Sequence, residues 1–260
     1  MSRRHDAGIG LDIGSTTTKG LILSSTGRVL GSHIMSSGSS VAEATQQVLD
    51  ILRSVTGIPV EDCPIVSTGY GRGSVASATR TVTEITCHSI GVHLLNPSIR
   101  LLIDVGGQDS KAIRIGANGR PSDFELNDKC SAGTGRFLEV MARVLGVAID
   151  ELGPLALRSS SPCSISSTCT VFAESEVIGR IGSGDSAEDI AAGIHLAMAT
   201  KVAALSKRLG IERPVGITGG VSLNPAFRYY LSRLLDCDLW TPENPQLTGA
   251  LGAATLALEQ

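Results

Sequence analysis

Two short stretches of the sequence combine an aspartate, closely spaced small residues and a lysine, a pattern suited to holding phosphate groups. They are residues 12–19 (DIGSTTTK) and 104–111 (DVGGQDSK). Their glycines let backbone N–H groups approach phosphate oxygens without a Cβ in the way, and such nests bind anions. Thr16, Thr17 and Ser110 add hydroxyl donors. We therefore expect the two stretches to face each other across a cleft and to hold the phosphates of one nucleotide.

The aspartate that begins each stretch stands at a predicted strand end, where it suits a Mg²⁺ ion held through water. We expect Asp12, Asp104 or Gln108 to orient the attacking water in phosphoryl transfer. A later glycine pair after a strand is expected on the ribose and base side. The nucleotide-binding residues predicted in this way are Gly14, Ser15, Thr16, Thr17, Lys19, Gly106, Gly107, Gln108, Asp109, Lys111, Gly219 and Gly220.

Two of the six cysteines occupy an unusual setting, each directly before a predicted helix. These are Cys130, in a Ser/Ala/Gly loop, and Cys169, in a Ser/Thr segment. The partial positive charge of a helix N-terminus stabilises a thiolate or a negatively charged cluster. We interpret Cys63, Cys87 and Cys237 as small buried apolar residues. Cys163 lies near Cys169 without a helix start of its own, and it is left out of the pair.

Two thiolates in one chain cannot complete a four-cysteine iron–sulfur site. Either a zinc ion or a cluster is shared across a symmetric dimer, or the two cysteines are not ligands. A two-fold axis through a [4Fe–4S] cluster would satisfy the count with two identical subunits.

The elements that must position these residues repeat along the chain. Shifting the sequence by 92 positions aligns five identical pairs without a gap, namely Asp12/Asp104, Gly14/Gly106, Lys19/Lys111, Gly27/Gly119 and Arg28/Arg120. This register predicts one strand–turn–strand–turn–strand unit used twice, and hence two similar α/β domains.

Hydrophobic periodicity and capping signals complete the expected element order. After the first hairpins, helices are expected over 41–55 and 82–95 around a strand at 65–69. After the second, helices are expected over 134–145, 171–181, 187–209, 225–235 and 247–258, with strands at 214–218 and 238–241. The predicted domains are 1–96 and 97–246, separated at Asn96-Pro97, and helix 247–260 is expected to pack back on the first domain.

Composition excludes several classes of function. The chain has 260 residues, 42% of them apolar, and a net charge of −3 without a block of like charges, so neither nucleic acid nor a membrane surface is expected as a partner. No apolar run has the length of a membrane span. The polar start, Met1–Ala7, lacks a signal peptide, and irregularly spaced cysteines argue against a disulfide framework, so we expect a cytoplasmic protein.

The ordered motifs resemble those of the actin, sugar-kinase and Hsp70 ATPase superfamily. They are Asp-x-Gly-x-Thr from Asp12, a second Asp-x-Gly from Asp104 and the late Thr218-Gly219-Gly220. The chain lacks a Walker-type Gly-x-x-x-x-Gly-Lys-Ser/Thr motif. The resemblance implies two actin-like, ribonuclease H-like domains with a nucleotide cleft between them, ATP or ADP, and Mg²⁺.

A narrower resemblance extends from Ile9 to Leu258. Residues 104–111, 127–137 and 169–176 are similar to those of the ATP-dependent activators of 2-hydroxyacyl-CoA dehydratases, a family that includes the ATPase subunits of benzoyl-CoA reductase. This resemblance implies a homodimer of anaerobic metabolism in which Cys130 and Cys169 of each subunit hold one [4Fe–4S] cluster. It also implies a ferredoxin or flavodoxin as reductant, and ATP-driven delivery of one electron to a dehydratase or acyl-CoA reductase partner.

Two other functions are compatible with the nucleotide motifs. A small-molecule kinase of the same fold would use Asp104 beside the γ-phosphate, and a filament or scaffold of the actin type would polymerise with ATP and hold no metal. A heterodimer with a sister ATPase subunit would satisfy the same cysteine count. Neither the acyl-CoA enzyme served nor any role for the four remaining cysteines follows from the sequence.

Overall fold

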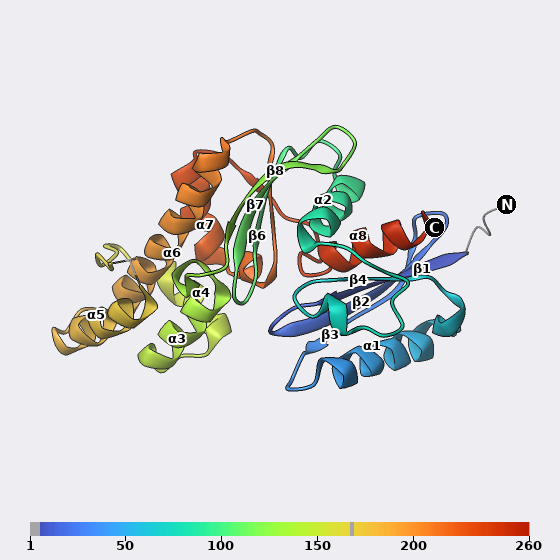
Figure 1. Ribbon diagram of the computed structural model, residues 1–260. Coiled ribbons are helices and arrows are strands. Elements are labelled where there is room, and N and C mark those ends of the chain that lie inside the picture. The colour runs from blue at the N-terminus through green and yellow to red at the C-terminus, as the bar shows by residue number, and fades with distance from the viewer. Residues whose placement is uncertain (1–5, 167–168, 260) are drawn as a thin grey trace. The chain divides into compact units, whose positions relative to one another are not determined.

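The computed structural model describes residues 6–166 and 169–259 (Figure 1). The chain divides into two compact units. The first comprises Met1–Ile99, Ile115–Ser122 and Pro242–Gln260, and the second comprises Arg100–Arg114 and Asp123–Thr241. The division into domains at Asn96-Pro97 stays a prediction.

The first unit is built on a five-stranded sheet in the order β3-β2-β1-β4-β5. The central strand β1 pairs antiparallel with β2 and parallel with β4. The strands are β1 (Ala7–Ile13), β2 (Thr17–Ser24), β3 (Val29–Ser36), β4 (Ile65–Thr68) and β5 (Arg80–Thr81).

Helices cover both faces of this sheet. Helices α1 (Val41–Thr56) and α8 (Thr248–Ala257) lie on opposite sides of it in Figure 1, and α2 (Glu84–Leu95) lies beside α8. Glycines make both approaches close. A Cβ at Gly10 would collide with the Ala250 carbonyl of α8, and one at Gly20 with the Val48 side chain of α1. Two short 3-10 turns, η1 (Val60–Asp62) and η2 (Arg72–Ser74), complete the unit.

The second sheet repeats the first strand for strand. Its order is β10-β9-β6-β7-β8, with β6 antiparallel to β7 and parallel to β9, as β1 is to β2 and β4. The strands are β6 (Leu101–Val105), β7 (Ser110–Ile115), β8 (Pro121–Asn127), β9 (Val215–Thr218) and β10 (Leu239–Trp240). The α/β class and the predicted repeat are therefore confirmed.

The repeat holds at the level of single hydrogen bonds. The Gly14 N–H donates to the Thr17 carbonyl, and the Gly106 N–H donates to the Asp109 carbonyl, each at 3.0 Å. The next turns also match, because Gly27 and Gly119 both have a positive φ, which side chains with a Cβ rarely adopt.

Helices gather on the second sheet around one apolar core. They are α3 (Gly135–Leu145), α4 (Ile149–Ala156), α5 (Thr170–Gly182), α6 (Ala187–Leu209) and α7 (Pro225–Leu235), with 3-10 turns η3 (Ser131–Gly133) and η4 (Gly220–Leu223). The predicted caps form, since the Ser186 side chain accepts from the Asp189 N–H and the Asn224 side chain from the Phe227 N–H.

Helix α4 is an element that the sequence analysis did not expect. Gly153-Pro154 inside it favours a break in the chain. The helix nevertheless forms because Leu152 and Leu155 are buried in the core of the second unit. Tertiary packing overrides the local preference here.

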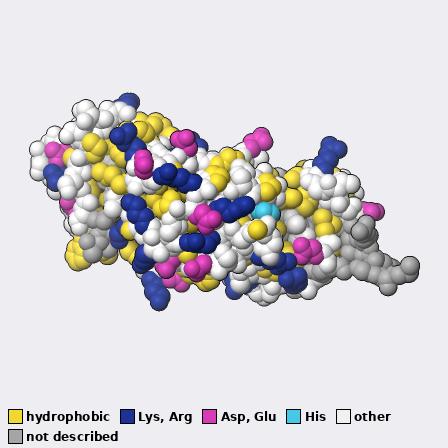
Figure 2. All heavy atoms as spheres, turned by 90° about the horizontal axis from the view of Figure 1, so that it is seen from above, with side chains coloured by type: hydrophobic (Ala, Val, Ile, Leu, Met, Phe, Trp, Pro, Cys, Tyr) yellow, Lys and Arg dark blue, Asp and Glu magenta, His cyan; other side chains and the backbone are white. Residues whose placement is uncertain are grey.

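The surface carries charges of both signs. On the face drawn in Figure 2, basic and acidic side chains lie interspersed. Among residues 6–166 and 169–259, none of the helices has both the length and the apolar character needed to cross a membrane.

Candidate nucleotide site and cysteine pair

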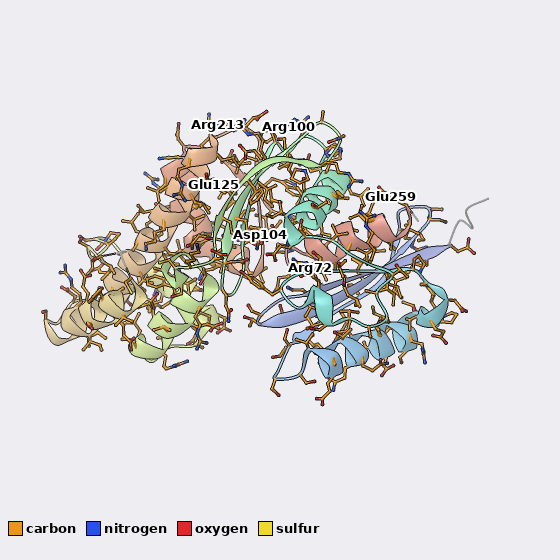
Figure 3. All side chains as sticks on the ribbon, in the orientation of Figure 1. Arg72, Arg100, Asp104, Glu125, Arg213 and Glu259 are labelled. Atoms are coloured by element: carbon orange, nitrogen blue, oxygen red, sulfur yellow. The ribbon has the colours of Figure 1, made fainter. Side chains whose placement is uncertain are left out.

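Asp104 is the last residue but one of β6, in the second unit (Figure 3). Two donors hold its side chain. The Thr218 hydroxyl donates to its Oδ1 at 2.8 Å, and the Lys111 Nζ lies 3.2 Å from its Oδ2. Lys111 is only 2% exposed and also lies 2.8 Å from the Asp109 Oδ2, an ion pair without the geometry of a directed hydrogen bond. One ammonium group thus faces two buried carboxylates. The three side chains together carry a net negative charge, which suits a bound cation.

Asp12 has the equivalent place in the first unit. The Lys19 Nζ lies 3.1 Å from its Oδ2. The two aspartate–lysine pairs are also cross-strand neighbours, Asp12 with Lys19 and Asp104 with Lys111. Each lysine therefore holds its own aspartate. The contact of both lysines with the nucleotide stays a prediction.

The equivalence of Thr68-Gly69 with the predicted motif residues Thr218-Gly219 was not expected from the sequence. Asp12 is paired with Thr68 across the parallel strands, as Asp104 is with Thr218. The glycines that follow, Gly69 and Gly219, have φ values of 86° and 84°. The signal was a Thr-Gly after each strand. The two Thr-Gly pairs are 150 positions apart (218 − 68) instead of 92, because several helices of the second unit lie between β8 and β9.

The predicted nucleotide contacts fall into exposed and buried groups. Ser15, Thr16, Gln108 and Gly220 are exposed, and Gly14, Thr17, Gly106 and Gly107 are partly exposed. Asp12, Asp104, Asp109, Lys111 and Gly219 are buried, and Lys19 is partly buried. The exposed turns can thus contact a ligand directly, whereas the buried charges hold the turns in place.

The start of α8 fits closely beside Asp12. The His88 Nδ1 lies 2.9 Å from the Thr248 hydroxyl. A Cβ at Gly249 would lie 3.0 Å from the Asp12 Oδ2 and 3.1 Å from the His88 Nε2. His88 is therefore a neighbour of the Asp12 side chain and is 5% exposed.

The turn after β6 is hydrogen-bonded to the first residues of α3. The N–H groups of Gly135 and Arg136 donate to the carbonyls of Gly106 and Gly107, each at 2.8 Å. A Cβ at residue 135 would lie 3.2 Å from the Gly106 oxygen, so glycine permits the approach. The phosphate turn of the second unit and the segment that follows Cys130 are therefore in direct contact.

Cys130 does not begin an α-helix, contrary to our expectation. It precedes the three-residue 3-10 turn η3, and α3 begins five residues later at Gly135. The loop is fixed by Asn127, which ends β8. Its Nδ2 donates to the Cys130 carbonyl at 2.9 Å, and its Oδ1 accepts from the Cys130 N–H at 3.3 Å.

Cys169 caps α5 as predicted, and its carbonyl accepts from the Ala173 N–H at 2.9 Å. Ser167 and Thr168 of the predicted motif lie outside the described residues. The residues that follow the two cysteines meet, since the hydroxyls of Ser131 and Thr170 lie 2.8 Å apart. The structure thus brings together the two cysteine segments, 39 residues apart at this contact.

The other four cysteines have raised thiol pKa values. Burial raises the pKa of the Cys87 thiol to about 12. Burial is also the largest cause of the raised pKa values of Cys63, Cys163 and Cys237. Cys87 is fully buried as expected, whereas Cys63 and Cys237 are only partly buried. Proton loss from these thiols is disfavoured, and so is thiolate chemistry.

A single chain offers an incomplete set of metal ligands. Within the described part of the chain, no group of three or more His, Cys, Asp or Glu side chains is arranged to hold a metal ion. Cys130 and Cys169 are two partly exposed thiols on joined segments. This donor set fits half of a four-thiolate site.

Comparison with known proteins relates the whole chain to one family. Residues 9–257 match the sequence model of the BadF/BadG/BcrA/BcrD ATPase family. The chain is 45% identical over 253 residues to a 2-hydroxyisocaproyl-CoA dehydratase activator of Clostridioides difficile, covering 97% of this chain and 95% of that protein.

Two solved structures are also similar over most of their length. One is the activator of the 2-hydroxyisocaproyl-CoA dehydratase from Clostridium difficile with bound ADPNP, with a TM-score of 0.92, 44% identity and coverage of 97% of this chain and 94% of that one. The other is the Acidaminococcus fermentans (R)-2-hydroxyglutaryl-CoA dehydratase component A, with a TM-score of 0.94, 38% identity and 98% coverage of both chains. The predicted actin-like fold is confirmed by these neighbours.

Proposed function

This chain belongs to the BadF/BadG/BcrA/BcrD ATPase family, and from that premise we propose that it couples ATP hydrolysis to one-electron transfer that activates a 2-hydroxyacyl-CoA dehydratase or a related acyl-CoA reductase. The observation that carries the proposal is the contact between the two kinds of chemistry. The turn at Gly106-Gly107 is hydrogen-bonded to Gly135-Arg136, five residues after Cys130. The names of the relatives supply the class of partner enzyme.

The two equivalent turns bind one nucleotide in this proposal. Exposed N–H and hydroxyl groups of Ser15 and Thr16 are available to phosphate, and so are the exposed groups around Gln108. Gly219 and Gly220 line the ribose and base side. Asp12 and Asp104 would hold Mg²⁺ through water, and that ion would neutralise phosphate charge.

Gln108 is the residue that we assign to orienting the attacking water. It is exposed at the tip of its turn, whereas Asp104 accepts from Thr218 and pairs with Lys111. Asp104 is therefore held in one position, which suits a fixed negative charge. Lys111 acts on the nucleotide through Asp104 and Asp109, which it holds in place.

Cys130 and Cys169 of two chains would hold one [4Fe–4S] cluster, which supplies one electron at low potential. A symmetric homodimer gives the four thiolates. The surface beside Cys169 supports it, because Val171, Phe172 and Ile178 of α5 are 66%, 68% and 56% exposed. A second copy of this chain would cover these apolar side chains together with the cluster.

Changes at the nucleotide reach Cys130 over a short path. Movement of the turn after β6 shifts the carbonyls of Gly106 and Gly107, and with them the start of α3. The Ser131–Thr170 hydrogen bond passes this shift to the start of α5. A ferredoxin or flavodoxin would serve as reductant, and the expected cytoplasmic location stays a prediction.

A small-molecule kinase of the same fold is the alternative from the sequence. It would use Asp104 as a base, but both Asp104 oxygens already have close donors. It also leaves the joined cysteine segments without a role. The activator accounts for both features.

Anaerobic purification tests the proposal. The expected product is a brown homodimer with about four irons per dimer, which hydrolyses ATP. Cys130→Ala and Cys169→Ala should each abolish bound iron and leave ATP binding intact. Cys163→Ala, in the same Ser-rich segment as Cys169, is the matched control and should keep its iron. A colourless, iron-free wild-type protein would exclude the proposal.

A further inference from the structure

A lysine from a distant part of the chain lies against one of the paired cysteines. Lys201 of α6 places its Nζ 3.5 Å from the Cys130 Sγ, although 71 residues separate the two. Its side chain is partly buried and runs past η3, where a Cβ at Gly133 would lie 3.8 Å from the Lys201 Cβ. The ammonium group is therefore held beside the sulfur by packing of its stem.

The backbone that carries this sulfur is also held in place. Asn127 binds both the N–H and the carbonyl of Cys130, and it also donates to the Ser110 hydroxyl at 3.3 Å. These bonds hold the backbone of Cys130 in place, and the Sγ contact with Lys201 gives the direction of its side chain. The contact between the Lys201 ammonium and the Cys130 sulfur is needed neither by the nucleotide site nor by the apolar core.

We infer that Lys201 is a positioning residue whose positive charge stabilises the Cys130 thiolate as a cluster ligand and raises the reduction potential of that cluster. This inference rests on the proposed function, because it requires the shared cluster. Hydrogen bonds and charges at the sulfurs are among the factors that set the potential of an iron–sulfur cluster.

The direction of the effect follows from charge balance. On reduction the cluster gains one electron, the chemical reductant loses one, and no bond is made or broken. The cluster is therefore more negative by one charge after reduction. A nearby ammonium stabilises that state more than the oxidised one, so removing the ammonium lowers the midpoint potential.

A redox titration of the anaerobic dimer, followed by the EPR signal of the reduced cluster, tests the inference. Lys201→Met and Lys201→Gln remove the charge, and Lys201→Arg keeps it. Lys207→Met removes a charge from an exposed position on the same helix and is the matched control. At the wild-type midpoint, we expect the reduced-to-oxidised ratio to fall about tenfold in the first two variants, equal to about 59 mV for one electron. Lys201→Arg and Lys207→Met should stay near the wild-type ratio.

The iron content of the Lys201 variants distinguishes a role of its charge from a role of its packing. Loss of iron from Lys201→Met and Lys201→Gln, but not from Lys201→Arg, would support the inference. Equal loss from all three Lys201 variants would overturn it, since packing would then be the role. An unchanged midpoint in a charge-removing variant with full iron would also overturn it and leave the proposed function standing. An iron-free wild-type protein would instead refute the proposed function.

Discussion

The N–H of Gly135 donates a 2.8 Å hydrogen bond to the carbonyl oxygen of Gly106, so the first residue of α3 rests on the turn that follows Asp104. The Arg136 N–H donates a second hydrogen bond, also 2.8 Å long, to the Gly107 carbonyl. The predicted phosphate turn and the segment that follows Cys130 are thereby joined directly.

Gly135→Val should uncouple the two sites. The new side chain would push against the Gly106 oxygen, which lies 3.2 Å from the Cβ position, and would weaken both hydrogen bonds. We expect the variant to bind ATP and keep its iron. The rate of iron removal by a chelator, compared with ATP and with ADP, should no longer depend on the nucleotide. Gly73→Val, at an exposed turn with open space around its Cβ position, is the control. A nucleotide response equal to that of the wild type would contradict the coupling.

Asp104→Asn should separate hydrolysis from cluster binding. The amide keeps the shape of the side chain but loses the charge that faces Lys111 and the expected Mg²⁺. We expect ATP turnover to fall by about 100-fold or more, as for loss of a positioned catalytic group. Iron per dimer should stay unchanged. Steady-state phosphate release and iron analysis measure the two quantities, and turnover at the wild-type rate would remove Asp104 from the site.

Lys111→Met should destabilise the protein far more than loss of an exposed ion pair. It leaves the buried carboxylates of Asp104 and Asp109 without their cation, which costs about 3–5 kcal/mol for a buried pair. Arg53→Met removes one partner of the exposed Arg53–Glu61 pair and should cost at most about 1 kcal/mol. Denaturant unfolding of the iron-free protein gives both free energies. Similar losses of unfolding free energy in the two variants would show that Lys111 does not hold the turn in place.

His195 should make the stability depend on pH in the acid range. Burial lowers the pKa of this histidine from 6.5 to about 4, while its Nδ1 lies 2.7 Å from the Ala191 carbonyl. Between these two values the unfolded chain binds a proton that the folded chain does not. Folding free energy is therefore fully retained above pH 6.5 and declines as the pH falls toward about 4, by about 3 kcal/mol in total.

His195→Gln removes this titration, so its unfolding free energy should fall less steeply over the same range. Unfolding of the iron-free wild type and variant at several pH values gives the two slopes. The carboxylates contribute equally to both proteins and cancel in the comparison. Parallel slopes would show that His195 is charged in the fold.

Much of this arrangement follows from sequence periodicity. Asp12 and Asp104, with their lysines and turns, are predictable because a strand, a turn and a strand are local events repeated in phase. Thr68-Gly69 was missed because its partner Thr218-Gly219 follows an insertion that changes the offset. The setting of Cys130 was read as a helix start, although Asn127 binds its N–H and only a short turn follows.

Contacts between residues far apart in the chain could not be predicted from the sequence pattern. Lys201 reaches Cys130 because α6 passes η3, and no local pattern records that neighbour. Helix α4 contains Gly153-Pro154, and burial of its leucines in the core of the second unit stabilises it. Such elements depend on partners far along the chain, which periodicity does not report.

The path of the chain between the two units has a consequence for how the protein is made. The chain crosses between them after residues 99, 114, 122 and 241. The first unit also needs α8, whose Ala250 carbonyl lies against Gly10 of its central strand. During synthesis, every residue of the second unit therefore leaves the ribosome before the first can close. The unit begun first is thus the one whose completion depends on the last segment of the chain to be made.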